Sequence, residues 1–430
     1  MNIELINTGS ELMLGRVLNT HQQWLCRRLA DLGYVVTRQV AVPDTAAAIT
    51  QAVREALSRA DLVIATGGLG PTSDDLTRDE VARLLGRTLH EDAAVLAHIR
   101  QMFASRRRPM PERTRVQTLI PAGAQVLFNP NGTAPGLAIE VKPNPFRADG
   151  QTSHLIMLPG PTREMRPMFN DTVVPLIKEK LPLAGAFVCR TLRTTGIGES
   201  MLEEQVHAPL QPMVAAGVEI GYCARPGQVD VRLSATGPDA EQRVGQAEAI
   251  VRKFLSPYIY AAGDEELEAA IIQLLTQRKE TLAVAESCTG GCIAHRLTNV
   301  PGASAVLMAG WVTYSNEAKQ RCLGVRAETL AQHGAVSEEV AREMAEGARR
   351  QAQVDYALSV TGIAGPGGGT PQKPVGTVFI GLAGASRTVV KQYPNAFDRE
   401  TFKQVTTQQA LELLRRAVLA GPTAAPGKAS

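Results

Sequence analysis

Residues 281–291 read TLAVAESCTGG, an apolar run that ends in polar residues and two glycines. A short apolar run followed by glycines and then by a helical pattern predicts a buried β-strand that leads into a helix. In open α/β sheets, ligands bind beyond the carboxyl ends of the strands. This stretch therefore predicts an α/β domain with a ligand site at the end of the strand, beside Ser287.

Two adjacent side chains at this strand end are candidate nucleophiles, Ser287 and Cys288. Strand alternation points them to opposite sides, so only one can face a cleft. Residue spacing leaves the choice open. Gly290 and Gly291 should let the backbone approach a ligand and leave free amides at the start of the helix, where negative charge is stabilised. Such amides would suit an oxyanion or a phosphate.

A serine nucleophile needs a base to take its proton. His295 and His333 both lie in helical patterns, where packing or surface positions are expected. Lys319, in YSNEAK (residues 314–319), opens a helix after an apolar strand. Burial would lower its pKa towards neutrality and permit a Ser-Lys dyad. A solvated lysine is the alternative, and spacing alone does not decide between the two.

The chain as a whole predicts an α/β protein with three domains and an unstructured end. Strand and helix patterns alternate over residues 1–170, which predicts a parallel sheet flanked by helices. Residues 171–262 show a β-α-β-β-α-β order around a Pro-Gly hairpin and predict a small α+β domain. The α/β alternation resumes over residues 263–420, and the composition of residues 421–430 predicts a disordered tail.

Composition argues against several classes of protein. The chain of 430 residues is 44% hydrophobic and 20% charged, which is typical of a globular protein. Its net charge of +3 gives no electrostatic footprint for nucleic acid. Without a signal-peptide pattern or an apolar run of about 20 residues, a cytoplasmic protein with no membrane contact is expected. The six cysteines lack paired zinc-type spacing, so no structural metal is expected.

The middle domain contains no carboxylate pair, Cys/His cluster or phosphate loop. A spacer or dimerisation role is therefore expected, which predicts a homodimer. Nucleic-acid binding through a KH-like face would need a GxxG loop with basic neighbours, and TTGIGES (residues 194–200) lacks this spacing. We do not expect a nucleic-acid partner.

The N-terminal domain carries a second glycine-rich strand end, TGGLGPTSDD (residues 66–75), after the apolar run DLVIA. Its glycines permit close approach of a phosphate, and Asp74 and Asp75 could hold a divalent cation that bridges it. TGSE (residues 8–11) adds the carboxylate of Glu11 at another strand end. The alternative is a capped helix start, in which aspartate stabilises the first turn.

Several motifs of the last third occur in order: ESCTGG, PGASA, VTYSNEAK, HGAVSEEVA and TGIAGPGGGTPQKPVGTV. Together they resemble the nicotinamide-nucleotide amidase domain of the CinA family of competence/damage-inducible proteins, over most of residues 265–415. The resemblance implies that Ser287 is the nucleophile and that Lys319 and Tyr314 assist its activation. The implied substrate-binding residues are Thr289, Gly290, Gly291, Thr361, Gly362 and Arg399. Phe397 stands where the family carries glycine, which is a departure beside Arg399.

The reaction implied by this resemblance is hydrolysis of the amide of nicotinamide mononucleotide (NMN) to nicotinate mononucleotide and ammonia, without a cofactor. The N-terminal motifs resemble the first domain of the same family, which shares its fold with molybdopterin-binding domains and is linked to metal-dependent ADP-ribose pyrophosphatase activity. This implies a divalent metal ion at Asp74, Asp75 and Glu11. The implied ligand-binding residues are Gly67, Gly68, Gly70, Thr8, Ser10 and Asn131. Two other interpretations stay open: a non-catalytic competence or DNA-damage adaptor, and a pterin-binding protein.

Overall fold

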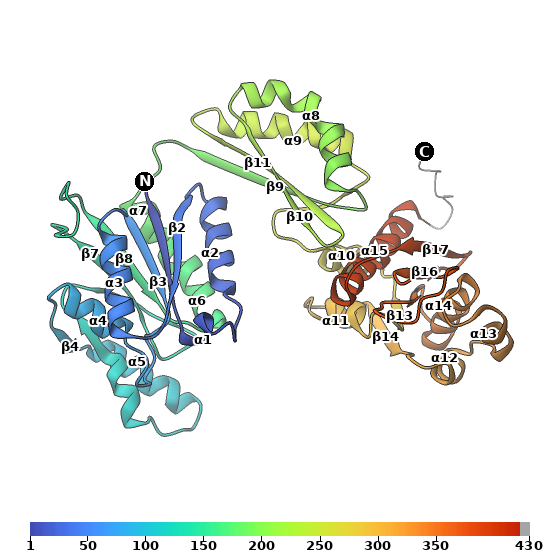
Figure 1. Ribbon diagram of the computed structural model, residues 1–430, viewed down its shortest axis with the longest axis horizontal. Helices are drawn as coiled ribbons and strands as arrows, with labels where there is room; N and C mark the ends of the chain where they lie inside the picture. The colour runs from blue at the N-terminus through green and yellow to red at the C-terminus, as the bar shows by residue number, and fades with distance from the viewer. Residues whose placement is uncertain (422–430) are drawn as a thin grey trace. The chain divides into compact units, whose positions relative to one another are not determined.

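The computed structural model describes residues 1–421 and divides into two compact units, Met1–Phe187 and a second that begins at Val188 (Figure 1). Apart from Gly421, the predicted tail lies outside the described residues. None of the helices in the described part is both long and apolar enough to cross a membrane. The first unit extends beyond the predicted boundary at residue 170 because α6 (Thr162–Met168) and α7 (Val174–Lys180) are joined by a π-helical turn and pack on the same sheet.

The first unit is built on a six-stranded sheet with the strand order β2-β1-β3-β8-β7-β6. The first four strands in this order are parallel, whereas β7 pairs antiparallel with β8 and β6 with β7. The predicted parallel sheet is confirmed for these four strands, and the antiparallel strands β6 and β7 at its edge were not predicted. No helix separates β7 from β8, and a parallel pair would need a longer crossover. The strands are β1 (Ile3–Thr8), β2 (Val36–Val42), β3 (Leu62–Thr66), β6 (Gln125–Leu127), β7 (Gly136–Val141) and β8 (Ser153–Leu158).

Alternate side chains of the central strands enter two cores, one on each face of this sheet. Ile6 and Val63 pack with α3 on one face, whereas Leu5 and Ile64 pack with α2 on the other. The remaining elements are α1 (Ser10–Met13), α2 (Thr20–Asp31), α3 (Ala46–Leu57), α4 (Thr77–Leu84), β4 (Leu89–Glu91), α5 (Ala93–Ser105), a 3-10 helix (Glu112–Thr118) and β5 (Leu119–Pro121). Because the central strands are fully buried, only their ends can reach a ligand.

The second unit begins with a four-stranded sheet in the order β10-β11-β9-β12, on which α8 and α9 pack side by side (Figure 1). The observed β-α-β-β-α-β order confirms the prediction for the middle domain. Its elements are β9 (Phe187–Thr195), α8 (Glu199–Ala215), β10 (Glu219–Arg225), β11 (Gln228–Thr236), α9 (Ala240–Leu255) and β12 (Ile259–Ala262).

The C-terminal domain has a five-stranded sheet in the order β14-β13-β15-β16-β17. β13 (Leu282–Glu286) lies between the parallel strands β14 (Leu307–Val312) and β15 (Tyr356–Gly362). The antiparallel strands β16 (Thr377–Ala383) and β17 (Thr388–Pro394) complete the sheet. Ser287 therefore follows a central strand at its carboxyl end.

Helices cover both faces of this sheet. Leu282 and Val284 of β13 pack in a core with α10, α11 and α15, while Ala283 and Ala285 face a second core with α12, α13 and α14. The helices are α10 (Leu267–Arg278), α11 (Cys292–Thr298), a 3-10 turn (Ala303–Ala305), α12 (Asn316–Leu323), α13 (Ala327–His333), α14 (Glu338–Ala352) and α15 (Arg399–Ala420).

Candidate active sites

Ser287 and Lys319 meet at the carboxyl end of β13. The Ser287 amide donates to Val360 O of the neighbouring strand at 3.0 Å, which fixes the backbone where the strand ends. Its hydroxyl oxygen lies 3.1 Å from Lys319 Nζ. Lys319 reaches this position from the first turn of α12, which Ser315 caps by accepting from the amide of Ala318. The structure thus joins a serine and a lysine that are 32 residues apart in the chain.

Lys319 is buried, with 1% of its surface exposed, so the alternative of a solvated lysine is wrong. Its ammonium group donates to the carbonyl of Thr313 at 2.7 Å, and it forms no ion pair with any described carboxylate. Desolvation lowers the pKa of Lys319 below the usual lysine value. A neutral Lys319 is therefore accessible at a lower pH than for a surface lysine, as a general base requires.

Cys288, the other candidate nucleophile, has a buried side chain. Its side chain belongs to the apolar core between the sheet and α10, α11 and α15. Burial raises the pKa of the Cys288 thiol to about 12, which keeps it neutral. Because the thiolate is the nucleophilic form of cysteine, the environment of Cys288 disfavours a catalytic role. The geometry favours Ser287 of the two candidates that the sequence left open.

Glu286 holds the turn that follows Ser287. Its carboxylate is 1% exposed and accepts from the amides of Gly291, Ile293 and Ala294 at 3.0, 3.1 and 2.9 Å. The amide of Gly290 donates to Ser287 O. The expectation of free amides from the two glycines is therefore wrong, because a carboxylate of the chain already occupies the start of α11. The sequence feature that could have predicted this role of Glu286 is an ionisable residue at the end of an apolar strand.

Thr289 is the residue of this turn with uncommitted polar groups. Its side chain is fully buried, and its hydroxyl has no hydrogen-bond partner within residues 1–421. Its backbone amide likewise donates to no atom of the described chain. A buried donor without an acceptor carries a free-energy cost unless a ligand satisfies it. The turn after Ser287 thus holds two donors, the amide and the hydroxyl of Thr289, that no described residue satisfies.

Tyr314 and Arg399 contact each other at the exposed rim. Arg399 Nη2 donates to the Tyr314 hydroxyl at 2.9 Å, and Nη1 donates to Gly365 O at 2.8 Å. The Tyr314 side chain is 62% exposed, and within residues 1–421 its hydroxyl makes no hydrogen bond to Ser287. The structure thus places Tyr314 as a support of Arg399, away from the direct role in serine activation that the motif implied.

Thr361 and Gly362, at the end of β15, make contacts that stabilise the fold. The Thr361 hydroxyl donates to Ala335 O at 2.7 Å. A Cβ on Gly362 would lie 2.8 Å from a methyl carbon of Val378, so the close packing of β16 requires glycine there. The Thr361 hydroxyl proton is already used and Gly362 has no side chain, so a substrate contact of Gly362 would have to come from its backbone.

In the first unit, a cleft of about 380 Å³ opens where β1, β3 and β8 end. Most of the predicted N-terminal residues line it: Thr8, Glu11, Gly67, Gly68, Gly70, Asp74 and Asp75. The lining also includes Thr133 and Pro159, together with Asp44 and Glu164, which the sequence did not single out. The amides of Gly68, Leu69 and Gly70 have no acceptor in the described chain. Successive free amides of this kind form an anion-binding concavity.

The predicted metal ligands do not form a closed site. Residues 1–421 contain no group of three or more His, Cys, Asp or Glu side chains placed to hold a metal ion. Asp75 instead accepts from the amide of Thr72 at 2.8 Å, before the helix begins. The alternative of a helix start capped by aspartate is wrong as well, because no side chain caps α4, which begins at Thr77. Asp74 and Glu11 line the same cleft without converging with it. These residues fit a cation only if a ligand supplies further oxygen atoms.

Several predicted binding residues have structural partners here. The Gly67 and Gly68 backbones have φ of +98° and +67°, and a Cβ on Gly68 would overlap the Thr77 hydroxyl. The Ser10 hydroxyl accepts from the amide of Asp44 at 3.1 Å. Asn131 is exposed and lies outside the cleft lining, with its amide bound by Asn129 Oδ1. These contacts show that several of the predicted binding residues stabilise turns of the chain.

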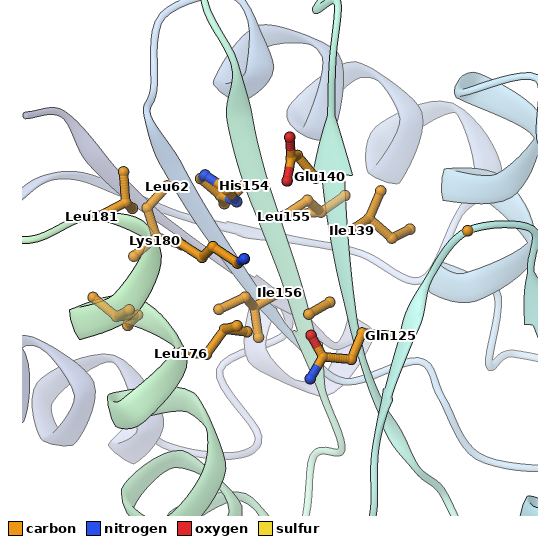
Figure 2. Close-up of a pocket in the computed structure, with 13 residues that line it drawn as sticks. Leu62, Gln125, Ile139, Glu140, His154, Leu155, Ile156, Leu176, Lys180 and Leu181 are labelled. Atoms are coloured by element: carbon orange, nitrogen blue, oxygen red, sulfur yellow. The ribbon is translucent and has the colours of Figure 1, made fainter.

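A separate cavity of about 200 Å³ lies at the amino ends of β3 and β8, against α7 (Figure 2). Figure 2 shows His154, Glu140 and Lys180 around a floor that contains Ile156. Burial lowers the pKa of His154, which makes a neutral imidazole the main form at neutral pH. No predicted site residue lines this cavity.

Three family profiles match the chain in succession. The profile described as "Probable molybdopterin binding domain" matches residues 4–179. "Damage-inducible protein CinA KH domain" matches residues 189–261, and "CinA C-terminal domain" matches residues 264–418. The fold is therefore a molybdopterin-binding-like α/β domain, a KH-like α+β domain and a C-terminal α/β domain. The KH identity was not predicted, since its expected loop spacing is missing.

Relatives match nearly the whole chain. A CinA-like protein of Akkermansia muciniphila is 44% identical over 416 residues, which cover 96% of each chain. A CinA-like protein of Gemmatimonas aurantiaca is 41% identical over 424 residues, which cover 97% of this chain and 96% of the relative. The crystal structure of the competence/damage inducible protein CihA from Agrobacterium tumefaciens is 41% identical and covers 35% of this chain and 92% of that chain, with a TM-score of 0.35.

Proposed function

The chain belongs to the CinA family, as its motifs predicted, and on that premise we propose that its C-terminal domain hydrolyses the amide of NMN. In this proposal Ser287 is the nucleophile and Lys319 is its base. The observation that carries it is the 3.1 Å contact between the serine hydroxyl and a buried lysine whose pKa is lowered. A serine beside a base of this kind is the arrangement of an activated nucleophile.

In the first half of the proposed reaction, neutral Lys319 accepts the proton of Ser287 as Oγ attacks the carbonyl carbon of the amide. The carbonyl oxygen gains the electron pair of the broken π bond and becomes an oxyanion. The amide and hydroxyl of Thr289 are donors available at this turn. Lys319 then gives its proton to the leaving nitrogen, the C–N bond breaks, and ammonia departs from an ester on Ser287.

In the second half, water attacks the ester carbon while Lys319 accepts a proton from the water. The ester bond breaks, and Lys319 returns the proton to Ser287 Oγ. Nicotinate mononucleotide leaves, so that one water is consumed and one ammonia is released per turnover. The carbonyl of Thr313 accepts from Lys319 Nζ and in this proposal holds it where it can exchange protons with Ser287 Oγ and with the attacking water.

The test is ammonia release from NMN by the full chain. Ser287→Ala should lower turnover by at least about a thousandfold, because the attacking atom is lost. Cys288→Ala is the matched control next to it and should keep most of the activity, since that thiol lies in the core. Undiminished turnover by Ser287→Ala, or loss confined to Cys288→Ala, would contradict the proposal.

We further propose that the N-terminal cleft binds the pyrophosphate of ADP-ribose and cleaves it with the help of a divalent cation. Support comes from the free amides of Gly68, Leu69 and Gly70, which suit phosphate oxygens. Asp74 and Glu11 would hold the cation together with the pyrophosphate, whose negative charge it would neutralise. Release of AMP that is lost in Asp74→Asn would support this. Binding of a pterin without AMP release would favour the pterin-binding interpretation, and neither activity in either domain would favour the adaptor.

Homodimer formation and a cytoplasmic location without nucleic-acid binding remain proposals. Light scattering of the purified chain gives the oligomeric state. Titration with labelled single-stranded RNA at low salt tests the KH-like domain, where electrostatic binding would be strongest.

A further inference from the structure

We propose that Lys403 on α15 is the cation that recognises the 5′-phosphate of the nucleotide substrate, beside the Ser287 turn. This inference rests on the proposed amidase function, and it adds a residue that the motifs did not single out. Lys403 Nζ lies 3.8 Å from the position that a Cβ on Gly290 would occupy. The ammonium group therefore lies over the turn that carries the nucleophile.

Lys403 is partly buried but has no partner in the described chain. It makes no hydrogen bond or ion pair within residues 1–421. The acidic residue one turn earlier, Glu400, accepts from Gln404 instead at 3.4 Å. Holding a lysine ammonium against a glycine turn without an anion costs side-chain entropy and solvation. A bound anion would satisfy its three donors.

The neighbouring residue Arg399 also indicates that a second cation is required to bind a phosphate here. Arg399 lies four residues before Lys403, on the same face of α15, but two of its nitrogens already bind Gly365 O and the Tyr314 hydroxyl. Its guanidinium is thus partly committed to holding the rim. A phosphate monoester carries a charge between about −1.5 and −2 at neutral pH, so a second cation with free donors is expected.

Two nearby carboxylates are already bound by backbone amides of the domain. Glu286 is bound by three backbone amides, and Asp398 accepts from the amides of Glu400 and Thr401 at the start of α15. The helix start is therefore closed to a ligand by Asp398, and positive potential comes from side chains. α15 packs on α11, the helix that follows the Ser287 turn. In the proposed complex, one molecule places its phosphate on Lys403 and its amide at Ser287.

The test compares binding of NMN with binding of nicotinamide riboside, which lacks only the phosphate. Titration calorimetry in a Ser287→Ala background removes turnover from the measurement. Lys403→Gln should weaken NMN binding about ten- to hundredfold, as loss of a charge-assisted hydrogen bond predicts, and leave the riboside unchanged. Lys403→Arg keeps the charge and should stay within about threefold. Lys391→Gln removes an exposed lysine from the same domain and is the matched control.

Equal weakening for both ligands, unchanged NMN binding in Lys403→Gln, or no NMN binding by the parent would each overturn the assignment. In the active chain, the corresponding result is a raised KM for NMN with kcat retained. NMN binding through Lys403 with no ammonia release by the chain that retains Ser287 would overturn the amidase proposal and leave the phosphate site standing.

Discussion

Replacement of Glu286 by alanine should destabilise the C-terminal domain more than any single loss at its surface. The carboxylate is buried and accepts three amide hydrogen bonds at 2.9 to 3.1 Å. A hydrogen bond to a charged group contributes about 1.5 to 3 kcal/mol, and the three are not additive because they share one carboxylate. We expect a loss of about 3 to 5 kcal/mol for Glu286→Ala and about 1 to 2 kcal/mol for Glu286→Gln.

The assay is guanidinium unfolding followed by Trp311 fluorescence in a Trp24→Phe background. The chain has two tryptophans, and Trp311 lies on β14 beside the strand that ends at Glu286. Glu317→Gln, an exposed carboxylate of the same domain, is the control and should change stability by less than about 0.5 kcal/mol. A loss under about 1 kcal/mol for Glu286→Ala would refute the inference that this carboxylate holds the turn.

Three further outcomes are expected. Because the neutral form of Lys319 is the base and burial lowers its pKa, kcat/KM for NMN should rise with pH on a limb below the usual lysine range; a flat profile would contradict this. Gly68→Ala should cost about 2 to 4 kcal/mol of N-terminal stability by thermal unfolding, since its Cβ would overlap the Thr77 hydroxyl, whereas Gly86→Ala, with similar φ and open space, should cost about 1 kcal/mol. Tyr314→Phe should lower kcat for NMN by less than about tenfold, and a loss as large as that of the nucleophile variant would restore its direct role.

Most of the fold could be predicted from local sequence patterns. The apolar run of β13 and its polar end correctly placed Ser287 at the carboxyl end of a strand, because both features depend on near neighbours in the chain. The antiparallel direction of β16 and β17 was not predicted, although β15 and β16 are joined by residues 363–376 without a helix, and such a connection favours an antiparallel pair.

The candidate site could be predicted only in part from the sequence, because its contacts join segments that are far apart in the chain. Spacing could not decide whether Lys319 was solvated, since its burial depends on how α12 meets β13. Glu286 had a visible signal as an ionisable residue in an apolar strand, but the helix start that it caps was assigned to a ligand. Lys403 follows Arg399 by one helical turn, and only the packing of α15 shows that it lies over Gly290. The glycines at 67 and 68 suggested a phosphate loop, whereas their nearest neighbours are threonines.

The most direct test of the central claim is mass spectrometry of the chain during turnover of NMN, after rapid acid quench and digestion. A serine nucleophile predicts a nicotinoyl-nucleotide ester on the peptide that contains Ser287, with fragmentation placing the added mass on that residue. The ester should be absent in Ser287→Ala. The same mass on Cys288, or turnover with no covalent adduct at any time before steady state, would contradict the account.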